Sequence, residues 1–326
     1  MITVEHLTKC YGDFVAVDDL SFEIGEGHVY GFLGPNGAGK STTMNIMTGC
    51  LSATAGHVRI DGHDIFDEPN QAKALIGYLP EQPPLYMNET PAEYLRFVGE
   101  AKGLRGEELT RQIEAVMEQT KIQDMRNRCI NALSKGYKQR VGIAQALLGN
   151  PKVIILDEPT VGLDPIQIIE IRDLIRQLGQ THTVILSSHI LSEVQTMCEK
   201  ILIIAKGKLI AFDAPENLER RLLSPSEITL TTEADEPTAR EILTGVDGIT
   251  ETQFTAGPDS LLTIHLRTDT HDIYRLSKAL FFAFAQKNTA LLEMALKKAN
   301  LEDIFLELTE GSEETKSSSE SKGAKA

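Results

Sequence analysis

Short apolar segments that end in polar residues define the first two thirds of the chain. Residues 29–33, 153–156 and 183–186 are almost wholly apolar, as expected of strands buried on both faces of a sheet. Helical spacing of apolar residues follows in 166–178. The pattern predicts an α/β fold in which helices alternate with the strands of a mostly buried sheet.

A helical insertion interrupts this α/β pattern at about residues 88–148. Thr90, Pro91 and Glu93 have the form of a capping box with proline in the first helical position. Leu109, Ile113 and the apolar pair 116–117 then follow helical spacing. A further helix is expected over 138–148, with Ser134 or Gly136 near its N-cap. We therefore expect a first domain, residues 1–222, with a helical subdomain inside it.

The pattern changes after about residue 222. Ile228, Leu230 and Thr232 alternate with polar residues, as do Leu262, Ile264 and Leu266, and a helix face follows at Ile273, Leu276, Leu280 and Phe284. With a strand at 291–295 and a last helix at 301–308, residues 223–309 are expected to form a small α+β domain, for which β-α-β-β-α-β is the candidate order. Residues 310–326 are rich in Ser, Glu, Lys and Gly and are expected to be a disordered tail.

Composition narrows the class of protein. The 326 residues are 41% hydrophobic and 24% charged, which is typical of a soluble globular protein. A formal net charge of −15 argues against broad nucleic-acid binding. We find no secretory signal and no apolar run of about 18 residues that could span a membrane. The four cysteines are scattered and form no C-x-x-C pair, which favours a reduced cytosolic protein over a disulfide or zinc framework.

The segment GPNGAGKST at 34–42 carries the strongest chemical signal. It fits G-x-x-x-x-G-K-[ST], with Gly34, Gly39, Lys40 and Ser41 at the fixed positions. Such a loop directs backbone N–H groups at phosphate, Lys40 adds a cation, and the Ser41 hydroxyl can bind Mg²⁺. A glycine-rich turn that matches by chance is the alternative. The expected strand before the loop and helix 41–48 after it argue against that alternative.

Polar residues at three other strand ends are candidates for the same site. Asp157, after the strand 153–156, can hold Mg²⁺, and the adjacent Glu158 can act as general base on the attacking water. His189 follows the strand that begins at 183 and is expected near the γ-phosphate. Glu81 and Gln82 follow the strand 75–79; a proline-rich surface loop is the alternative for these two.

Two further signals are weaker in isolation. Ser134 and Gly136 open a helix whose N-terminus suits an anion, although in isolation an ordinary N-cap is the preferred explanation. Tyr11, upstream of the glycine-rich loop, could stack on a nucleotide base, or it could simply pack in the fold.

Taken together, residues 1 to about 220 resemble the nucleotide-binding subunit of ATP-binding-cassette (ABC) transporters. The resemblance rests on motifs in a fixed order. Tyr11 matches the base-stacking aromatic, and VIILDEP at 153–159 matches Walker B with Glu158 as its catalytic glutamate. VGLD at 161–164 matches the D-loop with Asp164, and His189 matches the switch histidine. The Walker A and signature segments supply the other nucleotide-binding residues implied: Gly34, Pro35, Asn36, Gly37, Ala38, Gly39, Lys40, Ser41, Thr42, Ser134, Lys135 and Gly136.

The chain departs from the family pattern at two places. Its signature is LSKGY rather than LSGGQ, so Lys135 and Tyr137 are substitutions. The Q-loop glutamine, a metal- and water-sensing residue, is expected after the strand 75–79, where register places Glu81 and Gln82 comes one residue later. Either residue could fill that role, Gln82 as a metal ligand.

The resemblance implies a function as well as a fold. It implies a P-loop NTPase fold of the ABC type that binds and hydrolyses ATP with Mg²⁺. Two such subunits pair head to tail, and a homodimer is expected. By the same resemblance, separate membrane-spanning subunits are expected to dock on the helical insertion near 88–130, which would place the chain on the cytoplasmic face of the cell membrane.

The branch of the family is indicated by IGYLPE, LSKGYKQR and the late segment LEDIFLEL. These segments look most like exporters of the multidrug, antibiotic or gliding-associated type. The alternative is a soluble ABC ATPase acting on nucleic acid or in translation. Only short helices separate Lys40 from Leu133 and the chain has one cassette, which argues against that alternative. An idle regulatory cassette is disfavoured because Lys40, Asp157, Glu158 and His189 are all present.

Overall fold

The computed structural model describes residues 1–222, 226–257, 261–268, 270 and 273–297. The chain forms two compact units, which divide between Pro215 and Glu216. The sequence pattern suggested a boundary after residue 222, and the short helix α8 (Pro215–Leu222) occupies the interval. The expected last helix at 301–308 and the expected tail at 310–326 lie outside the described residues.

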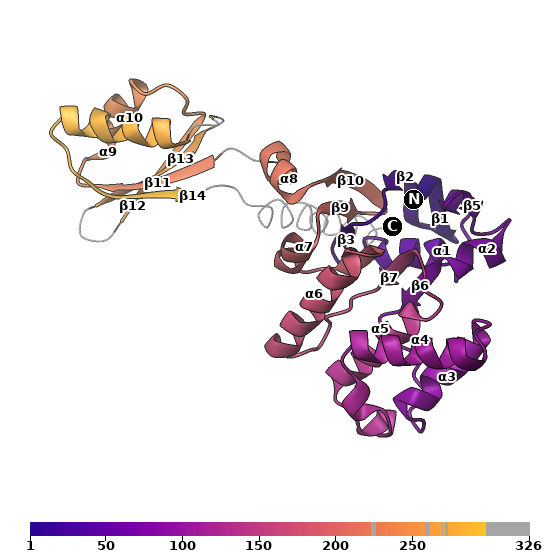
Figure 1. Ribbon diagram of the computed structural model, residues 1–326. Helices are drawn as coiled ribbons and strands as arrows, with labels where there is room; N and C mark the ends of the chain where they lie inside the picture. The colour runs from indigo at the N-terminus through magenta and orange to yellow at the C-terminus, as the bar shows by residue number, and fades with distance from the viewer. Residues whose placement is uncertain (223–225, 258–260, 269, 271–272, 298–326) are drawn as a thin grey trace, which may run out of the picture. The chain divides into compact units, whose positions relative to one another are not determined.

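A six-stranded sheet is the framework of the first unit (Figure 1). Its order is β10-β9-β3-β8-β7-β6, with β9, β3, β8, β7 and β6 parallel and β10 antiparallel to β9. Because the carboxyl ends of parallel strands meet at one edge, residues that follow β3, β6, β7 and β8 are brought together. The strands are β3 (Val29–Leu33), β6 (Ile76–Leu79), β7 (Val153–Leu156), β8 (Thr183–Ser188), β9 (Lys200–Ala205) and β10 (Lys208–Asp213).

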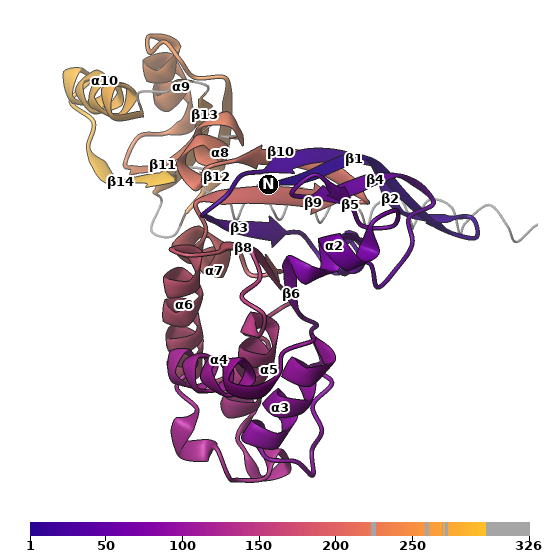
Figure 2. The same cartoon turned by 45° about the vertical axis from the view of Figure 1, so that its right-hand side comes forward.

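A second, antiparallel sheet of order β2-β1-β4-β5 completes the core of this unit (Figure 2). Buried apolar side chains of both sheets pack with helix α1 in one cluster that includes Leu20, Phe32, Met44 and Ile155. The rings of Phe22 and Phe32 meet edge to face with centroids 5.5 Å apart, an arrangement that aromatic pairs prefer. The elements are β1 (Ile2–Tyr11), β2 (Phe14–Ile24), β4 (Ala55–Ile60), β5 (His63–Asp64), α1 (Lys40–Met47) and α2 (Pro69–Ala74).

The helical insertion forms a separate lobe below the sheets in Figure 2. The capping box is present: the Thr90 hydroxyl accepts from the Glu93 N–H, and the Thr90 N–H donates to the Glu93 carboxylate at 2.9 Å. Leu109 and Ile113 are buried as their spacing predicts. The lobe contains α3 (Pro91–Ala101), α4 (Gly106–Gln119), the 3₁₀ turns η1 (Gln123–Met125) and η2 (Ile130–Ala132), and α5 (Lys135–Leu147).

Two helices connect the carboxyl-edge loops back to the sheet. Helix α6 (Pro165–Gly179) runs from the D-loop segment to β8, and α7 (Leu191–Met197) runs from the end of β8 to β9. Among the described residues, no helix combines the length and the apolar composition needed to cross a membrane.

The second unit has the β-α-β-β-α-β order that the sequence suggested. Its four strands are antiparallel in the order β12-β13-β11-β14. Residues Ile228, Leu230, Ile264 and Leu266 pack under α9 and α10 in one apolar cluster. Strand β12 was not recognised from the sequence because its side chains are mostly exposed and polar. The elements are β11 (Ser226–Thr232), α9 (Glu236–Thr244), β12 (Glu251–Ala256), β13 (Leu262–Thr268), α10 (Ile273–Gln286) and β14 (Leu291–Lys297).

Candidate active site

The glycine-rich loop turns tightly between β3 and α1. A Cβ at Gly34 would collide with the carbonyl oxygen of Ile204, and one at Gly39 would lie 2.6 Å from the carbonyl oxygen of Ala16. Gly39 also has a φ of 104°, in the left-handed region that glycine tolerates. Gly39 is the N-cap residue of α1 and has no side chain to occupy the first N–H groups of the helix. The loop therefore offers backbone donors and a helix N-terminus to an anion.

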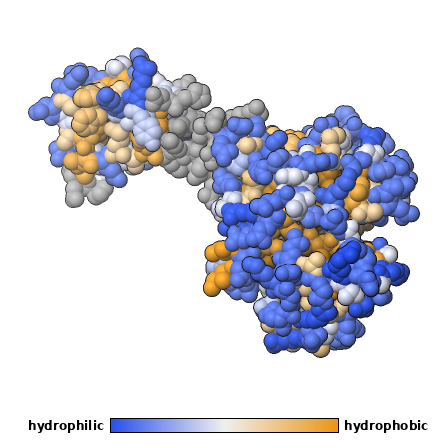
Figure 3. Space-filling view, viewed as in Figure 1, coloured by the Kyte–Doolittle hydropathy of each residue, from blue (hydrophilic) through white to orange (hydrophobic). Residues whose placement is uncertain are grey.

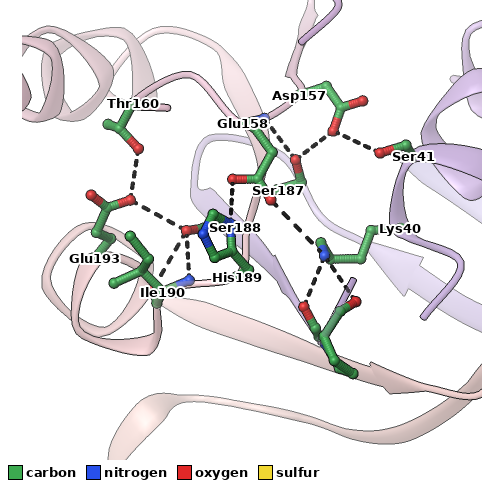
Figure 4. A network of polar contacts seen from close by, with 12 residues as sticks. Lys40, Ser41, Asp157, Glu158, Thr160, Ser187, Ser188, His189, Ile190 and Glu193 are labelled. Carbon is green, nitrogen blue, oxygen red and sulfur yellow. Dashed lines mark hydrogen bonds and ion pairs between the residues drawn. The ribbon is translucent and has the colours of Figure 1, made fainter. Parts of the chain in front are cut away.

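The Lys40 ammonium is held inside the loop, with 6% of the residue exposed. Its Nζ donates to the carbonyl oxygens of Gly34 at 2.8 Å and Pro35 at 3.2 Å, and it lies 3.9 Å from Glu158 Oε1 (Figure 4). Burial lowers the pKa of Lys40, and the negative charges of Glu158, Asp157 and Glu81 oppose that shift. Three acids thus surround one buried cation.

Asp157 and two serines form the adjacent part of the site. The hydroxyls of Ser41 and Ser187 both donate to Asp157 Oδ1, at 3.2 Å and 2.6 Å. The Ser187 hydroxyl also accepts from the backbone N–H of Glu158 at 2.7 Å (Figure 4). Ser187 was not among the site residues predicted from the sequence. Its position at the end of a buried strand, beside His189, is the signal that could have identified it.

Glu158 stands between Lys40 and His189. Its backbone φ of 48° is left-handed, a conformation that costs a non-glycine residue roughly 1–3 kcal/mol and that clusters at functional sites. Its Oε2 lies 3.0 Å from His189 Nδ1, and its Oε1 faces Lys40. The hydrogen bond from the Glu158 N–H to Ser187 fixes the backbone in this conformation.

Lys40, Ser41, Glu158 and His189 line a pocket of about 350 Å³, within the size range of small-ligand sites, whereas Asp157 and Ser187 lie outside its lining. Glu81 lines it, whereas Gln82 does not. Tyr11 is 50% exposed there, and the Lys9 ammonium lies 5.2 Å from the centre of its ring. Phe14, which the sequence analysis missed, pairs with Tyr11 across the β1–β2 hairpin. The lining residues are Tyr11, Phe14, Ala16, Asn36, Gly37, Ala38, Gly39, Lys40, Ser41, Thr42, Glu81, Glu158, Val161 and His189.

The signature residues Ser134, Lys135 and Gly136 and the D-loop Asp164 do not line this pocket, whereas Val161 at the start of the D-loop does. Ser134 is the N-cap of α5, where its hydroxyl accepts from the Tyr137 N–H at 3.3 Å. Asp164 caps α6 by accepting from the Gln167 N–H at 2.9 Å. Gly136 packs so closely on the Gln167 side chain that a Cβ would lie 2.7 Å from it. The candidate nucleotide residues therefore fall into two groups within one chain, with Ser134, Lys135, Gly136 and Asp164 in the second.

Comparison with known proteins identifies the family. A family model described as "ABC transporter" matches residues 17–161. The ABC transporter ATP-binding protein MJ1023 of Methanocaldococcus jannaschii is 37% identical over 222 residues, which cover 68% of this chain and 80% of that protein. This chain belongs to the ABC transporter family of ATP-binding proteins.

Other relatives of this ABC ATP-binding subunit match over different lengths. The linearmycin resistance ATP-binding protein LnrL of Bacillus subtilis is 32% identical over 95% of this chain and 98% of its own length. The bacitracin transport ATP-binding protein BcrA of Bacillus licheniformis is 39% identical over 68% of this chain and 72% of its own length. Among solved structures, the dimeric cassette MJ0796 bound to ADP and phosphate has a TM-score of 0.60 at 28% identity, covering 66% of this chain and 98% of its own.

These relatives confirm the family and branch that the sequence predicted, together with the α/β P-loop fold. The chain is an ATP-binding subunit of an ABC transporter and an ATPase. The alternative of a soluble ABC ATPase acting on nucleic acid or in translation is not favoured.

Proposed function

We propose that this chain binds Mg²⁺–ATP at the pocket beside Lys40, hydrolyses it between two copies of the subunit, and thereby powers export through separate membrane-spanning subunits. The observation that carries the proposal is the position of Glu158, held between a buried lysine and a histidine at the carboxyl edge of the sheet. A carboxylate fixed there can act as general base on a water that attacks the terminal phosphate.

The main polar residues in and beside the pocket have distinct roles in this proposal. Lys40 and the N–H groups of the loop bind the β- and γ-phosphates, and Tyr11 stacks on the base. The Ser41 hydroxyl and the Asp157 carboxylate are oxygen ligands 3.2 Å apart and fit Mg²⁺, which would neutralise phosphate charge when bound. His189 orients Glu158 and faces the terminal phosphate.

Glu81 is the residue that we propose for the Q-loop role, because it lines the pocket and contributes to the charge around Lys40. Gln82, which the sequence left as an alternative and as a metal ligand, lies outside that lining. The chain would thus use a carboxylate where the family pattern has an amide.

Pairing with a second copy completes the site in this proposal. Ser134, Lys135 and Gly136 carry a helix N-terminus suited to phosphate but do not line the pocket of their own chain. Helix α6 starts beside the D-loop and exposes Ile166 by 72% and Ile169 by 58%, and Figure 3 shows hydrophobic surface along α6. Exposed aliphatic side chains beside a site suit an interface between subunits. We therefore propose a head-to-tail homodimer.

The helical lobe supplies a second exposed apolar surface, which we propose as the docking site for the membrane subunits. Tyr86 and Phe97 are half exposed, with ring centroids 5.1 Å apart, and the exposed Met87 adjoins Tyr86 in the chain. Docking there would hold the chain at the cytoplasmic face of the membrane. The names of LnrL and BcrA, which refer to linearmycin resistance and bacitracin transport, support export as the direction of transport.

Glu158→Gln tests the hydrolytic role. The amide cannot accept a proton from water, so ATP hydrolysis should fall by roughly 10²–10⁴-fold while ATP affinity is retained. Nucleotide affinity and phosphate release are measured on the same preparation of the full chain. An equal loss of affinity would rule out the role given to Glu158.

A mixed dimer tests the shared site. Ser134→Arg should block the phosphate of the partner by bulk, and Lys40→Ala should disable the pocket of its own chain, so each homodimer should occlude no ATP. A mixed dimer places both defects in one site and leaves the other intact. Mixing two inactive preparations should therefore restore occlusion of at most one nucleotide per mixed dimer. Tagged mixed dimers that form and still occlude no ATP would contradict head-to-tail pairing.

A further inference from the structure

One buried carboxylate, that of Glu193, lies outside the pocket lining and has no role in the function proposed above. Glu193 is in the first turn of α7, and 2% of the residue is exposed. Burying a carboxylate is costly unless it is paired and hydrogen-bonded. The contacts of Glu193 should therefore reveal why a charge is kept at this position.

Glu193 contacts three other segments of the first unit, and Figure 4 shows the two that lie next to residues of the site. Its Oε2 accepts from the Thr160 hydroxyl at 2.7 Å and from the Ser188 hydroxyl at 3.2 Å. Its Oε1 lies 3.4 Å from the Arg172 guanidinium of α6. One carboxylate thus joins the loop after β7, the end of β8 and the helix that follows the D-loop.

Two of these partners are close in sequence to the proposed catalytic residues. Thr160 is two residues after Glu158, and Ser188 directly precedes His189. The Ser188 hydroxyl also accepts from the Ile190 N–H at 3.0 Å, so the segment on both sides of His189 is tied to the same group. The loops that carry Glu158 and His189 are therefore joined twice. Glu158 contacts His189 directly, and Glu193 links their neighbours Thr160 and Ser188.

We propose that Glu193 is a positioning residue for ATP hydrolysis, which fixes the loops of Glu158 and His189 relative to each other through Thr160 and Ser188. The inference rests on the proposed function, since it assigns Glu193 to the hydrolytic step of that site. Glu193 does not line the pocket, so we expect nucleotide binding to be independent of it. Misplacing a catalytic group by about 1 Å can cost roughly 100-fold in rate.

A purely structural role makes a different prediction from a positioning role. If Glu193 only stabilised α7, its loss would lower stability and leave the turnover of folded protein unchanged. If it positions Glu158 and His189, its loss lowers kcat while ATP affinity and KM hold, because Lys40 and the phosphate loop remain intact. The split between kcat and affinity separates the two roles.

The experiment uses the full chain with Mg²⁺ and ATP. Glu193→Ala should lower kcat about tenfold to 100-fold and change ATP affinity by no more than about threefold. Glu193→Gln keeps an oxygen that can accept from the hydroxyls and should retain part of the rate. Thr160→Val keeps the size of the side chain and removes one donor, so its loss of rate should be smaller. Combined with Glu193→Ala, Thr160→Val should cause little further loss, because both act on one interaction.

Val194→Ala is the matched control on the same helix. Val194 is buried, apolar and packed against Gly31 of β3, outside the polar cluster. This variant should lower the unfolding temperature and leave kcat within about twofold of the wild type. If Glu193→Ala does not fold, the kcat values of Glu193→Gln and Thr160→Val decide the question in the same way.

The outcomes distinguish this inference from the proposed function. If the wild type hydrolyses ATP and Glu158→Gln does not, the proposed function stands. A folded Glu193→Ala with wild-type kcat, or one that loses affinity as much as kcat, then overturns the inference alone. A wild type without Mg²⁺-dependent ATPase activity would overturn both.

Discussion

The two units of this chain differ in what they bury. The first unit, residues 1–215, is the ATP-binding cassette. It buries charged residues, among them Lys40, Asp157, Glu158 and Glu193. In the described part of the C-terminal unit, the buried polar residues are the two threonines Thr232 and Thr268, and the charged residues are not buried. Buried charge in a protein is costly, so it is retained where chemistry or a specific network requires it.

Sheet topology explains the difference. In the cassette, parallel strands end at one edge, and the polar residues that follow them share partners there. In the C-terminal unit the antiparallel strands alternate, which sends charged side chains to an exposed face. Arg267 lies there within 3.3 Å of Glu227 and 3.2 Å of Glu251 on neighbouring strands. Such exposed pairs contribute only roughly 0–1 kcal/mol each. The comparison indicates that the chemistry lies in the cassette.

Among the variants that test this difference between the units, Lys40→Ala should have the largest effect, which is on ATP affinity. Loss of a buried ammonium that we propose to contact phosphate should weaken ATP binding by about 10- to 150-fold, since hydrogen bonds to charged groups are worth roughly 1.5–3 kcal/mol. Lys287→Ala removes an exposed lysine of the C-terminal unit that pairs with Glu241 at 2.7 Å, and it should leave affinity unchanged. Equilibrium binding of ATP to both variants measures the contrast. If Lys40→Ala and Lys287→Ala lost ATP affinity to a similar extent, the proposed difference between the units would be wrong.

Two buried hydroxyls offer the next test. Ser187→Ala removes the bonds to Asp157 and to the Glu158 N–H, so hydrolysis should fall by at least about tenfold while the fold is kept. Thr232 makes a similar pair of bonds in the C-terminal unit, to the Ala290 carbonyl at 2.7 Å and from the Ala234 N–H at 3.2 Å.

Thr232→Val is therefore the matched variant for Ser187→Ala. It leaves the buried Ala234 N–H and the partly buried Ala290 carbonyl without their partner, which should cost about 1–3 kcal/mol of stability in that unit, and it should leave the rate unchanged. Thermal unfolding and phosphate release are measured for both variants. A normal rate for Ser187→Ala would show that the strained Glu158 backbone holds without this hydroxyl.

Substitution of one exposed tyrosine in each unit should have a smaller effect on ATP affinity. Tyr11→Leu removes the ring proposed to stack on the base and should weaken ATP binding by about five- to tenfold, the low end of the roughly 1–3 kcal/mol that stacking on an aromatic is worth, because Tyr11 is half exposed. Tyr274→Leu replaces a similarly exposed tyrosine of α10 and should not change affinity. The test compares ATP with inorganic triphosphate, which lacks the base. If Tyr11→Leu weakened both ligands equally, base stacking would be excluded.

Deletion after residue 222 should have the smallest effect on nucleotide binding. All lining residues of the pocket lie in the first unit, so the shortened chain should bind ATP within about twofold of the full chain, a difference below roughly 0.4 kcal/mol. Circular dichroism and thermal unfolding verify that the truncated protein is folded. A folded truncation that cannot bind ATP would mean that the C-terminal unit completes the site.

Local pattern was enough to predict much of this molecule. The glycine-rich loop, the capping box at Thr90 and the acids after β7 were predicted because each depends on neighbours within a few residues. The C-terminal order of elements followed from alternation and helical spacing, although the polar strand β12 was missed. The start of α5 was expected at 138, whereas the helix begins at Lys135 with Ser134 as its N-cap.

The sequence by itself thus determined the family, the nucleotide loop and the identities of the acids, since these are encoded in short ordered motifs. Only the tertiary structure decided that Ser187 bonds Asp157, that Glu193 joins Thr160 to Ser188, and that Glu81 rather than Gln82 lines the pocket. Each of those contacts joins segments far apart in the chain, or depends on which way a loop turns its side chains. Sheet order and register decide which distant segments meet and how the loops between them turn. Strand β8, for example, lies beside β7 and β3 only in the folded sheet.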